Sequence, residues 1–378
     1  METTTMRLLP LIAALTALTA PLTPVATTAA ADAATTIVRH HEEGPLIQVA
    51  LLLDDSGSME GLINQARAQL WELVGLLGRT TRDGRKARVE VALYHYGDLP
   101  ALAAPVVPLT GDLDLVSERL FTLNSGGGTE ACGQVIHQAL NQLSWRRSAN
   151  TLRLIVIAGN EPFTQGPIAW RSAVSAAREA GVIVHAIHCG ARRDGVSGEW
   201  EAAAIAGGGT FTCIDQDARA TLTTPQDDAL GKLNLQLNAT YLAYGAHGEV
   251  AYARQAMQDS NASGNGSLAS RAAAKSSEAY RNSAWDVVDA VKDGKLSLAT
   301  APAADLPAEL RDKSVAEREA LVAAKAKERS AIQRQIATLN QERTAWLATQ
   351  NPTASTLGDG LKKAVQDQAQ AAGFTVTP

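Results

Sequence analysis

Between residue 46 and about residue 220, short apolar runs rich in β-forming residues alternate with amphipathic stretches. The run LIQVALLLD (46–54) is almost continuously apolar, as expected of a central strand covered on both faces. The stretch that follows it places Leu62, Ala66 and Leu70 at helical spacing. Alternation of this kind predicts an α/β fold, a doubly wound and mostly parallel six-stranded sheet with helices on both faces.

The expected elements of this region follow from the same two periodicities. Strands are expected at 46–54, 87–97, 104–110, 151–163, 182–190 and 209–215, and helices at 61–78, 112–123, 130–145, 168–181 and 199–208. Ligands of such sheets bind outside the carboxyl ends of the strands. We therefore expect DDSGSM (54–59), NSGGGTE (124–130) and AGNEPF (158–163) to lie together at one edge.

The chain changes character after residue 225, where β-rich runs disappear and Ala, Gln, Lys, Glu and Ser dominate. Residues 230–378 are predicted to form an all-α helical domain, a bundle of three to five helices docked on or tethered to the sheet domain. Helices are expected at 230–245, 248–262, 268–294 and 314–350, with a Pro/Ala linker at 299–310. Lys and Arg among the apolar positions of the last helix argue against an extended coiled coil.

One helical turn in this region carries Trp285, Asp286 and Asp289. We interpret it as an anchoring tryptophan with two solvated acids.

The N-terminus has the composition of a secretory signal peptide over residues 1–33. One arginine precedes an apolar stretch, and Ala29-Ala30-Ala31 and Ala31-Asp32-Ala33 both fit a small-x-small cleavage site. We expect an exported protein, periplasmic or extracellular, without a membrane span after cleavage. The net charge is −5 and no segment concentrates Lys and Arg, so no nucleic-acid partner is expected.

The acceptor-rich motif LLLDDSGSM (51–59) follows the first apolar run directly. Asp54, Ser56 and Ser58 offer oxygen atoms either to cap the next helix or to hold a cation. Short hydroxyl side chains on a tight loop suit Mg²⁺, which prefers an octahedron of oxygen ligands and retains several waters. The motif alone leaves both readings open.

Together with Gly127, Gly128 and Thr129 in the second loop, this motif resembles that of a von Willebrand factor type A domain. The resemblance covers residues 46–222 and does not extend to the C-terminal helical region. Within this family, IAGNEPF (157–163) and AIHCG (186–190) resemble exported bacterial members. It implies a metal-ion-dependent adhesion site that holds Mg²⁺, or else Mn²⁺ or Ca²⁺. The residues implied as metal ligands are Asp54, Ser56, Ser58 and Thr129.

The sequence departs from the family pattern after the fourth strand of the series, where an aspartate is usual. Here the strand ends IVIAGNEPF, and Gly159 takes the position of that acid. The loss of one acidic ligand weakens cation binding, since affinity depends on ligand charge and number. Possible additional rim residues are Asp55, Asn160 and Glu161.

The three cysteines allow at most one disulfide within the chain, and an oxidising compartment permits it. Cys132 opens the helix after the threonine loop, Cys189 ends a strand, and Cys213 lies in the last strand of the series. Cys132–Cys189 is the favoured pair, with Cys189–Cys213 close behind. Three small buried hydrophobic residues are the alternative.

The motifs favour an exported, non-enzymatic module that binds another protein, with the helical domain orienting it. A hydrolase that uses the rim acids or Cys132 is the second hypothesis. Against it, the chain lacks a Ser-His-Asp order or a GxxxxGK[ST] phosphate loop. The third hypothesis is a scaffold that binds through the helical tail and retains only a vestigial rim.

Overall fold

A computed structural model describes residues 44–97, 105–218, 221–350 and 355–376. The predicted signal peptide, residues 1–33, lies outside these ranges. Within them, the helices are too short or too polar to cross a bilayer.

A six-stranded sheet forms the centre of the N-terminal half, in the order β5-β4-β1-β6-β7-β8. Its strands are β1 (Leu46–Leu53), β4 (Arg88–His95), β5 (Val107–Thr110), β6 (Thr151–Gly159), β7 (Ile183–Cys189) and β8 (Gly208–Ile214). Only β5 runs antiparallel to its neighbour, and the other pairs are parallel. The predicted doubly wound, mostly parallel sheet is confirmed.

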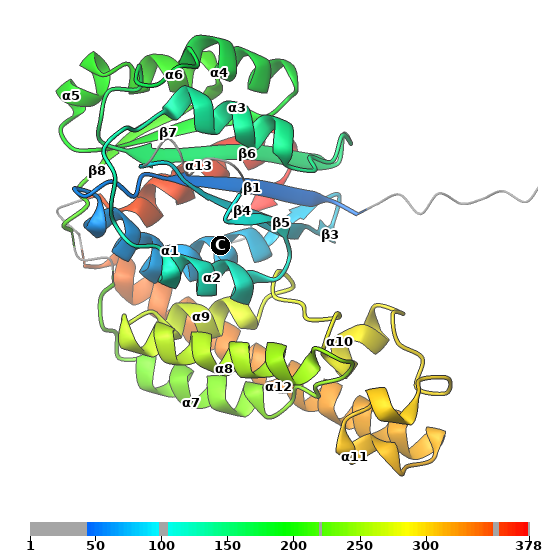
Figure 1. The fold of residues 1–378 in the computed structure, drawn as a ribbon. Coiled ribbons are helices and arrows are strands. Elements are labelled where there is room, and N and C mark those ends of the chain that lie inside the picture. The colour runs from blue at the N-terminus through cyan, green and yellow to red at the C-terminus, as the bar shows by residue number, and fades with distance from the viewer. Residues whose placement is uncertain (1–43, 98–104, 219–220, 351–354, 377–378) are drawn as a thin grey trace, which may run out of the picture. The chain divides into compact units, whose positions relative to one another are not determined.

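Helices cover both faces of this sheet, because alternate residues of each strand point to opposite sides. Along β1, Val49, Leu51 and Leu53 enter one buried apolar cluster, whereas Ala50 and Leu52 enter another. The first cluster is closed by α1 (Glu60–Gly78) and α2 (Leu113–Thr122), and the second by α3 (Cys132–Gln142), α4 (Trp170–Glu179) and α6 (Trp200–Ala206). Figure 1 shows the two layers below and above the sheet, with α5 (Arg192–Ser197) beside α6.

The carboxyl ends of three neighbouring strands meet at one edge of the sheet. Leu53, the last residue of β1, pairs with His95 of β4 on one side and with Ala158 of β6 on the other. The next residues of these chains are Asp54, Tyr96 and Gly159. The register therefore brings the DDSGSM loop between the ends of β4 and β6, and we call this edge the rim.

The C-terminal half is largely helical, with α7 (Asp227–Asn238), α8 (Gly248–Gly264), α9 (Leu268–Lys275), α10 (Val287–Lys292), α11 (Ala308–Arg311) and α12 (Val315–Ala348). The expected single helix over 268–294 is wrong, since it is divided into α9 and α10. The hydroxyls of Ser276 and Ser277 donate to the carbonyl oxygens of Ala273 and Ala274. Such local bonds compete with helix continuation and mark the end of α9.

The two acids expected to be solvated are buried. Asp286 is 0% exposed and Asp289 is 9% exposed. Arg329 of α12 donates from Nη1 to Asp286 Oδ2 at 2.7 Å and to Asp289 Oδ1 at 3.1 Å. The prediction was wrong because spacing within one helix shows only that the acids share a face. The arginine that pairs with them lies 40 residues beyond Asp289 in the chain.

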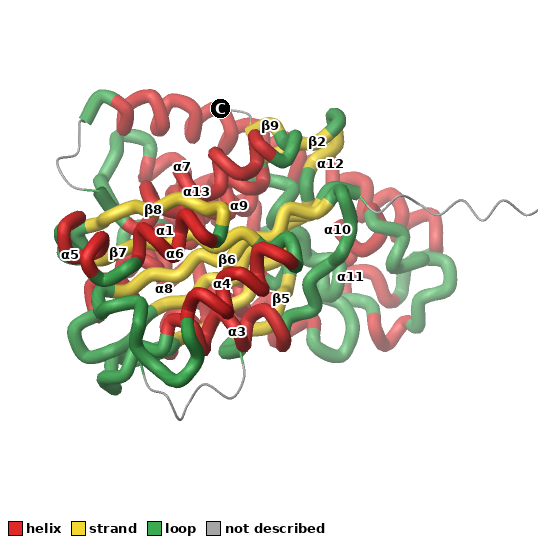
Figure 2. The backbone as a smooth tube through the Cα atoms, turned by 90° about the horizontal axis from the view of Figure 1, so that it is seen from above, coloured by secondary structure: helices red, strands yellow, loops and turns green. Residues whose placement is uncertain are grey.

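The last described segment returns to the sheet. Helix α13 (Leu357–Ala371) places Leu361 and Val365 in the apolar cluster shared with α1 and β1. Strand β9 (Thr375–Val376) pairs with β2 (Thr80–Arg82), which forms a hairpin with β3 (Arg85–Lys86). Figure 2 shows β9 beside β2. Part of the range 230–378 that was predicted as a helical domain therefore packs with the sheet.

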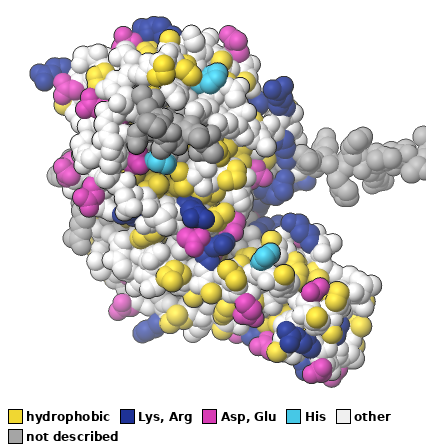
Figure 3. Space-filling model, in the orientation of Figure 1, with side chains coloured by type: hydrophobic (Ala, Val, Ile, Leu, Met, Phe, Trp, Pro, Cys, Tyr) yellow, Lys and Arg dark blue, Asp and Glu magenta, His cyan; other side chains and the backbone are white. Residues whose placement is uncertain are grey.

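The two halves are joined by a buried ion pair. Arg271 of α9 is 0% exposed, and its Nη1 donates to Oδ1 of Asp114 of α2 at 2.7 Å. The hydroxyl of Tyr280 donates to the other oxygen of Asp114. On the face drawn in Figure 3, acidic and basic side chains are interspersed across both halves.

Candidate functional site

The loop after β1 carries the acceptor-rich motif at the centre of the rim. Asp54 is buried, and its Oδ1 accepts the backbone N–H of Ser56 at 2.8 Å. The hydroxyls of Ser56 and Ser58 lie 3.4 Å apart, with Ser58 at the surface and Ser56 below it. The N-cap of α1 is Met59, and it has no side-chain capping bond. These side chains therefore do not serve as a helix cap.

Gly97 lets the end of β4 approach this loop closely, and Gly126 is hydrogen-bonded to the loop. A Cβ atom at Gly97 would lie 2.4 Å from the backbone nitrogen of Ser56, so a side chain there would displace the loop. The N–H of Gly126 donates to the carbonyl oxygen of Asp55 at 2.7 Å. The glycine-rich loop 124–130 is thereby fixed against the DDSGSM loop. Gln216 adds a bond from Nε2 to the carbonyl oxygen of Ser58.

Asp55 turns toward β4 instead of the two serines. Its Oδ2 lies 2.6 Å from Nδ1 of His95, and its Oδ1 accepts the N–H of Gly97 at 2.7 Å. Both carboxylate oxygens are thus engaged with the end of β4. The structure places this predicted rim residue in a positioning role for the loop.

The position of the missing acid is filled by a tyrosine. A Cβ atom at Gly159 would lie 2.4 Å from the hydroxyl oxygen of Tyr96 and 2.9 Å from Oδ2 of Asp54. That hydroxyl donates to the carbonyl oxygen of Ala158 at 2.8 Å. Glycine at this position therefore has a packing reason, because any side chain would collide with Tyr96 and Asp54.

Another acid, Glu130, faces the rim beside the predicted ligand Thr129. Thr129 is exposed, whereas Glu130 is 4% exposed. Burial raises the pKa of Glu130, while a hydrogen bond with Ser56 lowers it and the charge of Glu161 raises it again. Glu130 was not predicted, because a glycine-rich loop has no periodicity to show which side chain points inward. Its place directly before the buried start of α3 is the available signal.

The two residues after Gly159 also reach the rim. Nδ2 of Asn160 donates to the hydroxyl of Ser58 at 3.3 Å. Oδ1 of Asn160 is buried and has no hydrogen-bond partner among the described residues. Glu161 lies near enough to Glu130 to affect its pKa, and its carboxylate accepts from Gln165 at 3.4 Å.

The electrostatics of the rim favour a positive charge. Burial raises the pKa of Asp54 to about 6; the bonds from Ser56 oppose this, and repulsion from Glu130 and Asp55 adds to it. Oδ2 of Asp54 is buried without a partner among the described residues. A buried unpaired acceptor is costly, and a cation relieves it.

The donor set at the rim fits a hard divalent cation. Oxygen atoms come from carboxylates, hydroxyls and an amide, which are the ligands that Mg²⁺ and Ca²⁺ prefer. The residues that could hold the ion are Asp54, Ser56, Ser58, Glu130 and Asn160. Within the described ranges, no three His, Cys, Asp or Glu side chains form a metal-binding group by themselves. A cation here would depend on the serine hydroxyls.

The three cysteines are free in the structure, so neither Cys132–Cys189 nor Cys189–Cys213 is formed. Cys132 belongs to the apolar cluster on the α3 face of the sheet, whereas Cys189 belongs to the cluster on the α1 face. Cys213 pairs in register with His188, the neighbour of Cys189, and adjacent strand residues point to opposite faces. Burial raises the pKa of the Cys132 thiol, which disfavours a reactive thiolate.

Residues 48–226 match the family model of the von Willebrand factor type A domain. A comparison with the curated proteins finds no match for this chain.

Solved structures to which this chain is similar include the conserved hypothetical protein BatB from Bacteroides thetaiotaomicron, at 19% identity over 45% of this chain and 90% of that one, with a TM-score of 0.35. Another is the SpRpn10 VWA domain, at 16% identity over 50% of this chain and 95% of that one, with a TM-score of 0.32. A third is proximal thread matrix protein 1 from the mussel byssus, with a zinc-occupied MIDAS motif, at 15% identity over 46% of this chain and 43% of that one, with a TM-score of 0.34.

Proposed function

Because residues 48–226 match the family model of the von Willebrand factor type A domain, we propose that the protein is a non-enzymatic interaction module. It binds a partner protein through a divalent cation held at the rim. The observation that carries this proposal is the convergence of Ser56, Ser58 and Oδ2 of Asp54 at the carboxyl ends of β1 and β6, where this oxygen has no partner among the described residues.

In this proposal, Ser56 and Ser58 are direct ligands of Mg²⁺, with Mn²⁺ or Ca²⁺ as substitutes. Asp54 and Glu130 supply the negative charge, and Asn160 supplies an amide oxygen. Glu130 thereby provides the acid that Gly159 lacks. Thr129, on the exposed side of the same loop, stays a predicted ligand. When bound, the cation supplies an electrophilic position for an oxygen atom of the partner.

The proposed role is non-catalytic because, among the described residues of the rim, no nucleophile lies beside a free base. Cys132 is buried on α3, and burial raises the pKa of its thiol. The hydroxyls of Ser56 and Ser58 bond to each other and to acids and an amide. Nucleophilic catalysis by serine needs an adjacent general base, and His95 is committed to Asp55 at 2.6 Å.

We further propose that the protein is exported and acts in the periplasm or outside the cell, on the strength of the N-terminal sequence. Capture of partners from a native envelope by the full chain, with Mg²⁺ and with EDTA, tests the interaction. We expect a partner retained with Mg²⁺ and released by EDTA. Ser58→Ala should abolish its retention, whereas the exposed Ser330→Ala on α12 should not. Retention unchanged by EDTA and by Ser58→Ala would contradict the proposal.

One observation favours the scaffold hypothesis as a second candidate. Leu235 of α7 is 69% exposed, and Val250 and Met257 of α8 are 63% and 60% exposed. Exposed apolar side chains of this size mark protein contacts when they form a contiguous patch. Leu235→Gln and Met257→Gln should reduce capture if the helical half binds the partner, and should leave it unchanged if the rim does.

A further inference from the structure

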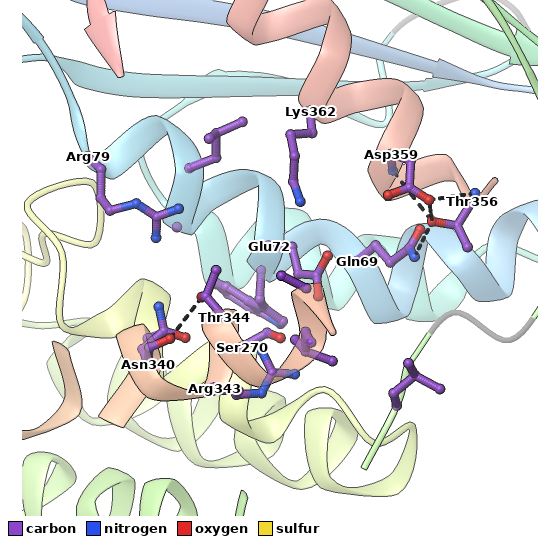
Figure 4. A pocket seen from close by; sticks show the side chains of 17 residues that line it. Gln69, Glu72, Arg79, Ser270, Asn340, Arg343, Thr344, Thr356, Asp359 and Lys362 are labelled. Carbon is purple, nitrogen blue, oxygen red and sulfur yellow. Dashed lines mark hydrogen bonds between the residues drawn. The ribbon is translucent and has the colours of Figure 1, made fainter. Parts of the chain in front are cut away.

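A cavity of about 380 Å³ lies between the sheet domain and the helical half, at the opposite end of α1 from the rim. The polar and charged side chains of its lining include Glu72, Arg79, Ser270, Asn340, Arg343 and Lys362. Ligand sites commonly occupy cavities of about 300 to 1,000 Å³ at such junctions. Figure 4 shows side chains from α1, α9, α12 and α13 directed toward one space.

The wall formed by α1 presents two opposite charges that do not meet. Glu72 and Arg79 are seven residues apart, which is about 10 Å along a helix axis. Neither side chain forms an ion pair within the described residues, and Nε of Arg79 is buried without a hydrogen-bond partner there. Arg79 as a whole is half-buried, and a partly buried guanidinium without a counter-charge favours an anionic group of a ligand.

The surroundings of Glu72 leave its carboxylate available to a positively charged group of a ligand. Burial raises the pKa of Glu72, although the positive charges of Arg343 and Lys362 lower it. Arg343 is engaged through Nε with Asp227 at 3.2 Å. Asp359 accepts from the backbone and hydroxyl of Thr356 as the cap of α13. Glu72 is therefore the acid of this cavity that has no hydrogen bond within the described part of the chain.

The remaining lining residues suit a short organic molecule. Leu76, Leu222 and Leu347 give the cavity apolar wall, while Ser270 and Asn340 offer a hydroxyl and an amide. A single amino acid holds its two charges too close together to reach both Glu72 and Arg79. A dipeptide spans about 7 Å in an extended conformation, which the two long side chains can bracket.

We propose that this cavity binds a small zwitterionic molecule with the size and charge separation of a dipeptide. Its carboxylate pairs with Arg79, its ammonium group pairs with Glu72, and its apolar part lies against the leucines. The site is independent of the cation at the rim, since it uses the C-terminal half of α1 instead of the loop that precedes this helix.

Calorimetric titration of the full chain with the dipeptide Ala-Leu, its N-acetyl form and its C-terminal amide tests this assignment. We expect Ala-Leu to bind, and each blocked form to bind at least about tenfold more weakly, since each loses one charge-assisted contact. The Arg79→Gln variant should bind Ala-Leu no more tightly than the wild-type chain binds the C-terminal amide. The Glu72→Gln variant should bind Ala-Leu no more tightly than the wild-type chain binds the N-acetyl form.

Arg119→Gln and Glu249→Gln, at exposed positions outside the cavity, are the matched controls and should bind Ala-Leu as the wild-type chain does. No binding of Ala-Leu up to about 10 mM would overturn the proposal. Equal affinity for the three peptides would overturn it too, and this comparison needs only the wild-type chain. Circular dichroism of each variant checks that it folds.

Discussion

The hydroxyl oxygen of Tyr96 lies 2.4 Å from the position that a Cβ atom of residue 159 would take, so Tyr96 occupies the space of a side chain at Gly159. The rim is therefore packed so tightly at residue 159 that no acidic side chain fits there. The sequence departure and the tyrosine are two parts of one arrangement.

The packing of these two residues predicts a measurable coupling. Gly159→Ala should lower the free energy of unfolding by about 1 to 3 kcal/mol, the typical cost of overpacking. Combined with Tyr96→Phe, which removes the obstructing oxygen, the substitution should cost less than it does alone. Urea unfolding of both single variants and the double variant gives the coupling energy. Gly128→Ala, where a Cβ meets nothing within 4 Å, is the control; strictly additive effects would contradict this packing.

The raised pKa of Asp54 predicts a pH-dependent stability in the absence of metal. A carboxyl group whose pKa is raised on folding stabilises the protein below its unfolded pKa, and this contribution is lost as the pH rises through the folded pKa. For Asp54 these values are 3.8 and about 6. Asp54→Asn should therefore be more stable than the wild-type chain at pH 7.5, by about 3 kcal/mol at most.

This advantage of Asp54→Asn should shrink toward zero as the pH falls to 4. Urea unfolding in EDTA across this range measures it, with the exposed Asp367→Asn as the control. A difference between Asp54→Asn and the wild-type chain that does not vary with pH would show that the Asp54 carboxylate is not strained by burial.

The ion pair between Asp114 and Arg271 predicts how firmly the halves are joined. Both side chains are buried, so Arg271→Met leaves the charge of Asp114 without its main partner. We expect a loss of about 3 to 5 kcal/mol in the free energy of unfolding. Asp114→Asn combined with Arg271→Met should recover part of it. Arg254→Met, which removes a more exposed pair with Asp112, should cost about 1 kcal/mol or less.

Cation affinity should depend on pH through the same carboxyl group. A metal binds the deprotonated form, so protons compete with it. Since the pKa of Asp54 is about 6, the affinity for Mn²⁺ should rise between pH 5 and pH 7.5. Calorimetry at several pH values measures this affinity. If the affinity for Mn²⁺ does not change over the range, Asp54 is not a ligand of the ion.

Much of the fold could be predicted because it depends on local periodicity. The apolar run 46–54 and the helical spacing after it identify β1 and α1, and the alternation fixes the parallel sheet. The hairpin of β2 and β3 was not predicted, although its Asp83-Gly84 turn, whose residues both have positive φ, is a typical hairpin sequence. The return of α13 to the sheet leaves no such local mark, since its apolar face fits a helical bundle equally well.

The meeting of four candidate residues at the rim was predictable, because residue type and strand position suffice for it. Asp54, Ser56, Ser58 and Asn160 come together as the strand ends require. Three other features depend on side-chain direction in loops, which the sequence does not show. They are the inward position of Glu130, the place of Tyr96 beside Gly159 and the contact of Asp55 with His95. The disulfide prediction was wrong for a related reason, because the distribution of the cysteines over two faces of the sheet depends on the register of β7 and β8.

The central claim is that the rim holds a divalent cation through its serines and Glu130. Its most direct test is the melting temperature of the metal-free full chain titrated with Mg²⁺ or Mn²⁺, for the wild type, Ser58→Ala and Glu130→Gln. Binding to the folded state alone raises the melting temperature with cation concentration. We predict such a rise for the wild-type chain, its loss in Ser58→Ala and its weakening in Glu130→Gln. A wild-type melting temperature that neither cation changes, or an equal rise in all three proteins, would contradict the claim.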